Sequence, residues 1–549
     1  MRPKPRQKRL PRAQKGAQAS LGKDLPQLGD ALEPRLLLAA EVLTYHNDNL
    51  RTGENLSETV LTPGNVNAAT FGKVGQVAVD GAVYAQPLYK ANVNLGPLGL
   101  HNVVFVATEN DSVYAYDADT LALLWHDSFI NPAAGITPVP AADVKAFDVT
   151  PVIGITGTPV IDAATSTLYV VDKVKDSSSG KPVYAARLHA LDLATGAEKD
   201  GGPVNLQAVS RGRGDGSVRG RITFSPLWEF QRSGLLLDNG TVYVAFASQG
   251  DNGPYHGWVL GYNAQTLQQV ASFNATPNGK AGGIWMSGGA IAADAAHNLF
   301  LATGNGTFDA NRGGKNVGDS VLKLSGSTGL KLLDYFTPSN EAALKSADLD
   351  LGAGGTLLLP DQPGAHPHML LAGGKEGTLY LVDRDNLGRF NRRKNRVVEE
   401  MHKAVSGSFS TPAYFNSTVY LVGSAPQGDA PGGEVLQAFS LANGVLLPNP
   451  TKGAYTYGYP GSTPSISANG TASGIVWTLD NGGWQSQQQA ILRAYDATNV
   501  TRELYDSTQA GARDQGGPAV KFTVPTVVNG KVYVGGGGTL TVYGLLPAR

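Results

Sequence analysis

The chain has no cysteine among its 549 residues. Disulfide bonds, thiolate catalysis and cysteine-ligated zinc or iron–sulfur sites are therefore excluded. Charge is also scarce, since Asp, Glu, Lys and Arg make up 16% of the residues and the formal net charge is −1. Without a basic excess to neutralise phosphates, the chain does not fit a nucleic-acid binder. No apolar run reaches the length of about 18 residues that a transmembrane helix needs, so no such helix is predicted.

Glycine, by contrast, is abundant, with 69 residues. This is well above the usual share of roughly 7%. Many short strands joined by glycine-rich turns fit such a composition better than helices do. The sequence therefore predicts an all-β protein.

One phrase returns along the chain: a short β-rich stretch followed by Ala/Leu-x-Asp-x-x-Thr-Gly or a degenerate copy of it. In a turn between two strands, the Asp carboxylate accepts backbone N–H bonds and the Gly adopts positive φ, so we interpret the phrase as structural. Repetition at this scale is the mark of a repeat architecture. The copies lie at residues 113–120, 188–196, 259–266, 379–383, 436–444 and 492–498.

Two further series of strands each count eight units of about 60 residues, enough for a four-stranded blade with loops. One series consists of β-branched and aromatic stretches at 103–107, 167–171, 241–245, 298–302, 368–372, 418–422, 474–478 and 531–535. Before each lies a small-residue strand, suited to the crowded axis of a propeller, at 85–89, 157–162, 234–238, 287–291, 355–359, 410–414, 462–466 and 524–528.

The last unit ends after its third strand, at 539–546, and a spare strand precedes the first unit, at 71–79. Pairing these two would close the ring and remove both exposed edges. We therefore predict an eight-bladed β-propeller of four-stranded antiparallel sheets, closed by an N-terminal strand that completes the last blade. Seven blades, with one unit misread, is the alternative. The predicted domains are a basic disordered segment (1–40), a polar capping segment (41–70) and the propeller (71–549).

The N-terminal segment carries seven positive charges in its first fifteen residues. No apolar core follows directly, as it would in an ordinary secretory signal. Residues 32–39, Leu-Glu-Pro-Arg-Leu-Leu-Leu-Ala, resemble a motif near the N-terminus of large exported proteins of Planctomycetes-type bacteria. The resemblance implies export, to the periplasm, the cell surface or the medium; a disordered basic tail with a chance leucine run is the alternative.

The phrase Ala115-Tyr-Asp-Ala-Asp-Thr120, continued to Trp125, resembles the repeat of pyrroloquinoline quinone (PQQ) type propellers, and the similarity extends over about residues 71–546. The resemblance implies the propeller fold, and it suggests PQQ and calcium as cofactors. Relatives place a Trp at the end of each blade, where it locks neighbouring blades, and only Trp125 stands clearly at such a position here. The calcium ligands of the family match no set of positions in this chain, so no metal site is predicted.

Several residues are candidates for a site. His256 and Glu229 are weak candidates for a general base, against a satisfied loop histidine and a strand-entry residue as structural alternatives. Trp285, Gln231 and Lys375 are weak candidates for binding a cofactor: the first two stand at the entries of inner strands, and Lys375 stands in a turn between strands. Inter-blade packing for Trp285 and a hairpin with a solvated ion pair for Lys375 are the structural alternatives. The densest polar cluster outside the tail precedes the propeller, and caps one face or binds a ligand: His46, Asp48, Asn49, Arg51 and Glu54.

The leading hypothesis is an exported or cell-surface propeller, expected to be a monomer, that binds an envelope protein or a small polar ligand at its axial face. A PQQ-dependent dehydrogenase that oxidises alcohols or sugars is the first alternative, in which PQQ would lie on Trp285. A hydrolase or lyase with acidic groups in the axial funnel is the second.

Overall fold

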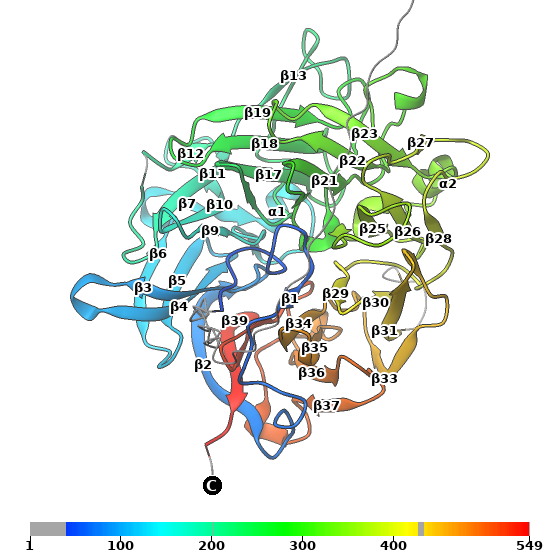
Figure 1. The fold of residues 1–549 in the computed structure, drawn as a ribbon. Coiled ribbons are helices and arrows are strands. Elements are labelled where there is room, and N and C mark those ends of the chain that lie inside the picture. Colours follow the sequence, from blue (N-terminus) through cyan, green and yellow to red (C-terminus); the bar gives the residue numbers. More distant parts are fainter. Residues whose placement is uncertain (1–39, 200, 426–432, 548–549) are drawn as a thin grey trace, which may run out of the picture. The chain divides into compact units, whose positions relative to one another are not determined.

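The computed structural model describes residues 40–547, apart from residue 200 and residues 426–432. The predicted export motif and basic tail lie outside the described residues. The described residues form eight antiparallel β-sheets arranged around one axis as an eight-bladed propeller, as the repeat count predicts (Figure 1). Within them, no helix has the length and apolar composition that crossing a bilayer requires.

Each blade runs from an inner strand at the axis to an outer strand. Blades 1 and 2 contain β3 (Leu88–Asn94), β4 (Leu100–Thr108), β5 (Ser112–Asp117) and β6 (Leu123–Ser128), then β9 (Val160–Asp162), β10 (Thr167–Asp176), β11 (Val183–Asp192) and β12 (Val204–Asn205). Blades 3 and 4 contain β16 (Leu236–Asp238), β17 (Thr241–Ser248), β18 (Trp258–Asn263) and β19 (Gln269–Asn274), then β20 (Ala292–Ala293), β21 (Asn298–Ala302), β22 (Val321–Ser325) and β23 (Leu332–Thr337).

The other four blades follow the same order. Blades 5 and 6 contain β24 (Leu357–Leu358), β25 (Met369–Gly373), β26 (Leu379–Asp383) and β28 (Glu399–Met401), then β29 (Ala413–Phe415), β30 (Thr418–Ser424), β31 (Gly433–Ala442) and β33 (Thr451–Tyr457). Blades 7 and 8 contain β34 (Ser465–Asn469), β35 (Ala472–Asp480), β36 (Ile491–Asp496) and β37 (Glu503–Asp506), then β38 (Thr526–Val528), β39 (Lys531–Leu545) and β2 (Phe71–Ala82).

Short additions extend some blades. Blade 2 gains β7 (Ile136–Pro140) and β8 (Val152–Ile153), which flank the helix α1 (Ala141–Val144), and blade 3 gains β15 (Glu229–Phe230). In the loop after β26, β27 (Arg389–Phe390) pairs in parallel with β23 of blade 4. The helix α2 (Glu341–Ser346) lies between blades 4 and 5 in the chain.

The ring closes as predicted. Strand β2 pairs antiparallel with β39, and Phe71 lies opposite Leu545 and Lys73 opposite Tyr543. Strand β39 turns back on itself: a methyl group added to Gly544 would lie 3.2 Å from the Gly530 carbonyl oxygen. A straight strand would hold these residues roughly 45 Å apart. Blade 8 is thus built from both ends of the propeller, with β2 as its outer strand.

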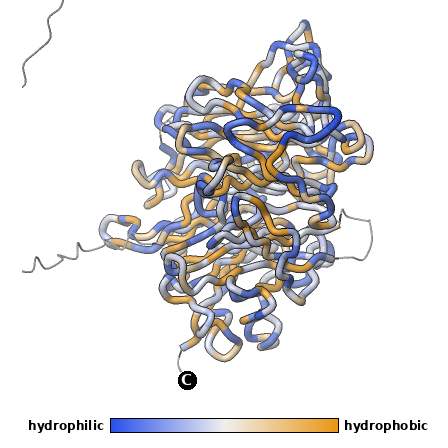
Figure 2. Tube along the Cα trace, turned by 45° about the vertical axis from the view of Figure 1, so that its right-hand side comes forward, coloured by the Kyte–Doolittle hydropathy of each residue, from blue (hydrophilic) through white to orange (hydrophobic). Residues whose placement is uncertain are grey.

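The core lies between the blades, and the two-residue period of the strands builds it. In β17, Val242, Val244 and Phe246 pack in a cluster with blade 2, whereas Tyr243 and Ala245 pack in the cluster with blade 4. Side chains alternate between the two faces of a strand, and here both faces meet another sheet. This accounts for the nearly continuous apolar stretches of the second strands. In Figure 2 the hydrophobic stretches lie mainly inside, and many connecting loops are hydrophilic.

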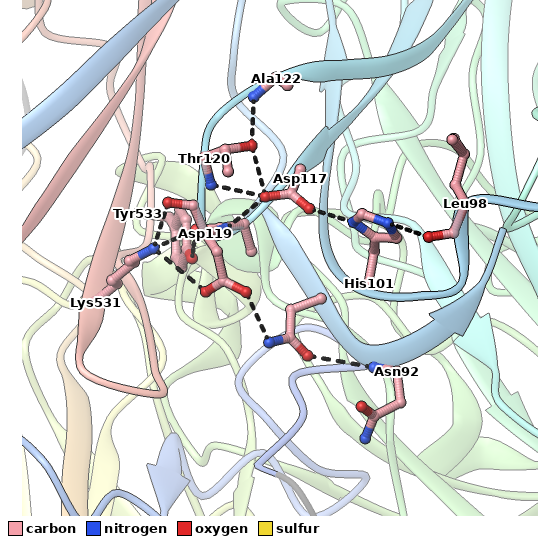
Figure 3. A network of polar contacts seen from close by, with 11 residues as sticks. Asn92, Leu98, His101, Asp117, Asp119, Thr120, Ala122, Lys531 and Tyr533 are labelled. Carbon is pink, nitrogen blue, oxygen red and sulfur yellow. Dashed lines mark hydrogen bonds and ion pairs between the residues drawn. The ribbon is translucent and has the colours of Figure 1, made fainter.

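The repeated Asp phrase stabilises turns between strands, as expected. Asp117 accepts hydrogen bonds from the backbone N–H groups of Asp119 and Thr120 and from the Thr120 hydroxyl (Figure 3). Asp192, Asn263 and Asp496 make corresponding bonds in their own turns. The single predicted blade-locking Trp also packs as expected, since Trp125 donates to the Leu193 carbonyl of blade 2 at 3.0 Å.

One predicted inner strand is wrong. We expected blade 4 to begin with a strand at 287–291, but the chain forms a 3-10 turn at Met286–Gly288, and β20 follows only at Ala292. Ser287 has a φ of 49° and its hydroxyl bonds the Ala353 carbonyl of the next blade. The small residues here allow a coiled entry rather than an extended one.

A segment before the propeller, residues 42–58, threads the axis and contacts the inner strand of every blade; we call it the plug (dark blue in Figure 1). Its hydrogen bonds follow blade order: Val42 with Tyr89, Leu43 with Ile161, Asn49 with Leu237 and Ala293, Leu50 with Leu358, Thr52 with Tyr414, Gly53 with Ile466, and Asn55 with Val527. Near its end, β1 (Glu54–Asn55) pairs with β34. The inner strands, which would otherwise leave unpaired groups at the axis, are thereby satisfied.

The polar cluster of the sequence lies in the plug and holds it in place. His46 is fully buried, and its ring nitrogens lie 2.7 and 2.8 Å from the carbonyl oxygens of Arg51 and Pro464. Arg51 is also fully buried and donates to the carbonyls of Ile291, Tyr45 and Asp48. These contacts favour the capping interpretation of the cluster over the binding one.

Burial and the nearby carboxylate of Asp48 raise the pKa of Glu54 to about 7. A carboxyl group with a raised pKa binds its proton more tightly in the folded protein, so stability falls as pH rises from about 4.5 to about 7. We expect Glu54→Gln to remove this slope, worth about 1–2 kcal/mol after allowance for partial exposure. Denaturant unfolding of both proteins at about pH 5 and about pH 8 measures it; parallel profiles would contradict the expectation.

Candidate functional site

A cavity of about 210 Å³ lies at the axis, at the level of the residues that precede the inner strands. The plug fills the axis at the level of the inner strands themselves. Ligand pockets for drug-sized molecules usually span about 300–1,000 Å³, so this cavity suits a smaller ligand. Seven blades line it, with Asp148, Val149, Phe230, Arg232, Ser248, Gln249, Gly250, Asp251, Trp285, Ser287, Asp350, Ala353, Lys375, Phe409, Tyr459, Lys521 and Phe522.

The cavity has an aromatic side. Phe409 and Tyr459 meet edge to face with ring centres 5.3 Å apart, and Tyr459 and Phe522 do so at 6.4 Å. These residues come from the entries of blades 6, 7 and 8. Trp285, from the entry of blade 4, packs edge to face against Tyr255. Flat rigid walls of this kind favour a ligand with a planar apolar part.

Arg232 follows β15 and is 7% exposed. Its guanidinium carbon lies 4.3 Å from the centre of the Phe522 ring and 5.7 Å from that of Tyr84. Within the described part of the chain, no group accepts a hydrogen bond from the guanidinium. Burial lowers the pKa of Arg232, although Asp148 and Glu109 act in the opposite sense. A buried cation with free donors that faces a cavity is suited to hold an anion.

Lys375 lies on another side of the cavity, after β25. Its ammonium nitrogen is 2.6 Å from Asp350 and 3.1 Å from Asp348. Burial opposes the charge of Lys375, but these two carboxylates raise its pKa overall. Asn305 completes the network, because its backbone N–H bonds Asp350 at 2.6 Å and its side-chain amide bonds Asp348 at 2.7 Å.

Lys521 is the third cation and precedes the inner strand of blade 8. Its ammonium nitrogen lies 3.0 Å from Asp148 and 4.3 Å from the centre of the Trp484 ring. Burial lowers the pKa of Lys521. The three cations thus differ in their partners: Lys375 has two carboxylates, Lys521 has one, and Arg232 has none among the described residues.

A second cavity, of about 610 Å³, shares Asp251 with the first. It is lined by Asp215, Asp251, Gly253, Pro254, Tyr255, Lys280, Ala281, Asn305, Gly306, Lys345 and Asp348. The network of Asn305, Asp348 and Lys375 links the lining of the two cavities.

Two of the residues suggested for cofactor binding, Trp285 and Lys375, lie together in the axial cavity. Gln231 does not line it; its side chain bonds the backbone of Gly157 and Ser233. Glu229 is buried behind the wall, where it accepts hydrogen bonds from the His256 N–H and the Trp258 indole, and burial raises its pKa well above the usual value. The ring nitrogens of His256 face Thr276 and the Asp215 carbonyl.

Sequence reasoning missed Arg232, Lys521, Asp148 and Asp350. A signal was present: a large charged or aromatic residue stands just before a small-residue inner strand in Arg232-Ser-Gly, Phe409-Ser-Thr-Pro, Tyr459-Pro-Gly-Ser and Lys521-Phe-Thr-Val-Pro. Because inner strands converge on the axis, the residues before them converge as well.

The cavity does not fit the metal ion that the family resemblance suggests. Asp350 is already bound by Lys375 and by the Asn305 N–H. No group of three or more His, Asp or Glu side chains in the described ranges is placed to hold a metal ion. The three cations and the aromatic side match the carboxylates and the rings of PQQ in chemical type, but a cavity of about 210 Å³ is smaller than the usual pocket for a ligand of that size. The calcium ion that the resemblance suggests lacks ligands among these residues.

The comparisons agree with this fold. A quinohemoprotein alcohol dehydrogenase, ADHIIG from Pseudomonas putida HK5, matches with a TM-score of 0.58 at 14% identity, over 93% of this chain and 81% of that one. A europium-containing methanol dehydrogenase matches with a TM-score of 0.60 at 14% identity, over 92% and 98%. No family model and no curated protein matches the sequence. At this identity the likeness shows the eight-bladed fold alone.

Proposed function

We propose that the chain is a ligand-binding propeller whose axial cavity holds a small, flat organic anion. The observation that carries the proposal is Arg232, a buried guanidinium that faces the cavity and has no carboxylate partner among the described residues. Lys375 and Lys521 add positive charge, and the aromatic side accommodates a ring. A buried charge without a partner is costly, so a complementary anion is the group the cavity can best accept.

Trimesate, a flat benzene tricarboxylate, is the probe of choice. We expect it to bind with a dissociation constant on the order of 100 µM, which corresponds to a modest ligand efficiency for its size. Isothermal titration at low and at high salt measures the affinity, and high salt should weaken it. The uncharged tricarboxamide of the same shape is the matched control and should not bind. Equal binding of the two compounds, or of neither, would contradict the proposal.

A PQQ-dependent oxidoreductase is the second candidate, favoured by the meeting of Trp285 and Lys375 in one cavity. PQQ would supply two-electron oxidation of an alcohol or sugar. In that case Arg232, Lys375 and Lys521 would bind its carboxylates and Trp285 would pack against its rings. Dye reduction with alcohols and sugars, in the presence of PQQ and calcium, tests this; tight binding of PQQ without turnover would leave the ligand-binding function alone.

Export is a further part of the proposal and rests on residues 32–39 of the sequence. Fractionation of producing cells tests it. A full-length protein confined to the cytoplasm would contradict export without affecting the binding function.

A further inference from the structure

Asp148 differs from Asp350, the carboxylate that binds Lys375, because its side chain is exposed to solvent. Its side chain is 62% exposed, whereas that of its partner Lys521 is 3% exposed. The ion pair therefore joins a buried cation of blade 8 to a carboxylate that reaches it from the solvent side. Burial alone would raise the pKa of Asp148, but Lys521, Arg232 and Lys375 together hold it below its usual value. The carboxylate thus lies in the field of all three cations.

The backbone that carries Asp148 is anchored independently of this ion pair. It belongs to the segment between β7 and β8, where Val144 and Val149 are buried in a cluster with Phe230. Asn252 of blade 3 donates to the carbonyls of Val144 and Lys145 at 3.0 and 3.1 Å. Because these contacts hold the segment, the Asp148 side chain can turn toward solvent without unfolding its surroundings.

Resting on the function proposed above, we propose that Asp148 is a resident competitor: its carboxylate pairs with Lys521 in the free protein and gives way to a carboxylate of the ligand. The ligand's anion then joins Lys521 to the unpartnered Arg232, which Asp148 leaves without a hydrogen bond. Asp148 therefore sets the affinity of the site, and selects ligands with enough negative charge to replace it.

Whether one substitution strengthens or weakens binding distinguishes a competitor from a residue that only lines the cavity. Asp148→Asn keeps the size of the side chain and removes its charge. We expect it to bind trimesate about tenfold more tightly than the wild type, on the scale measured for close charge pairs at interfaces. Loss of a residue that merely lines or supports the site would leave the affinity unchanged or weaken it. Titration calorimetry gives the affinity, and a thermal melt shows whether the variant is folded.

A double-mutant cycle with Lys521→Met assigns the effect to the pair. We expect Lys521→Met to weaken binding and to abolish the gain from Asp148→Asn. Asp361→Asn, which removes an exposed carboxylate outside both cavities, is the charge-matched control and should change the affinity less than about twofold. A gain from Asp148→Asn that persists without Lys521, or that Asp361→Asn reproduces, would overturn the inference.

The two proposals fail differently. If the wild type binds trimesate and Asp148→Asn binds it no better, the competitor role is wrong and the binding function stands. If neither protein binds trimesate, the binding function itself is wrong.

Discussion

Arg232→Met is expected to weaken trimesate binding about 100-fold and, at the same time, to leave the free protein as stable as before or more stable. Truncating one partner of a buried charge pair at an interface typically costs 2–5 kcal/mol or more, and about 2.7 kcal/mol corresponds to 100-fold. In the free protein the guanidinium is 7% exposed and lacks a hydrogen-bond acceptor among the described residues. Removing its desolvation cost should therefore offset the loss of its contacts with the Phe522 and Tyr84 rings.

Calorimetric titration and thermal melts of the same samples measure both effects. Arg232→Lys is the matched variant: it keeps the charge but loses the planar donor set, so binding should fall less than in Arg232→Met. Arg312→Met, on an exposed loop turn, should change neither property. A variant that melts several degrees lower would show that Arg232 is a structural residue, and unchanged binding would remove it from the site.

Arg51→Met is expected to produce the largest loss of stability, about 4 kcal/mol, because it removes the side chain that donates several buried hydrogen bonds in the plug. Arg51 is fully buried and donates to the Ile291, Tyr45 and Asp48 carbonyls and to the Thr44 hydroxyl. Burial lowers its pKa to about 10, so it is still charged near neutral pH. A methionine of similar length fills the space but leaves these acceptors without a donor.

For a chain of this length, such a loss corresponds to a fall in Tm of about 4 °C. Arg51→Lys keeps a charge and some of the hydrogen bonds, so its Tm should fall by roughly half as much. Differential scanning calorimetry measures both. A fall below about 1 °C for Arg51→Met would mean that the plug is not a stabilising element, and trimesate binding should persist in either variant that folds.

The fold could be predicted from the sequence because the blades repeat. The second strand of each blade is a recognisable stretch of β-branched and aromatic residues. The pairing of β2 with β39 could be predicted because the last unit lacks a fourth strand and a spare strand precedes the first unit. The inner strand of blade 4 was misplaced because small residues permit a coiled entry as readily as an extended one, and Ser287 is held by a bond to the next blade.

The site was less accessible to sequence reasoning. Trp285 and Lys375 stand in glycine-rich stretches of the sequence, whereas Arg232 and Lys521 are single cations in ordinary loops. They form one site because the eight blades close into a ring, which brings residues as distant in the chain as Arg232 and Lys521 into one cavity. His256 stood out as a titratable group beside an aromatic residue, yet its ring nitrogens face Thr276 and a backbone carbonyl.

The plug also has a consequence for how the protein is made. Residues 42–58 leave the ribosome before any blade exists, yet their partners extend to Val527 and Gly530, near the opposite end of the chain. The plug therefore cannot complete its contacts until the last blade has been translated. Blade-by-blade folding during synthesis can go far, but the ring closes around the plug only once blade 8 has formed.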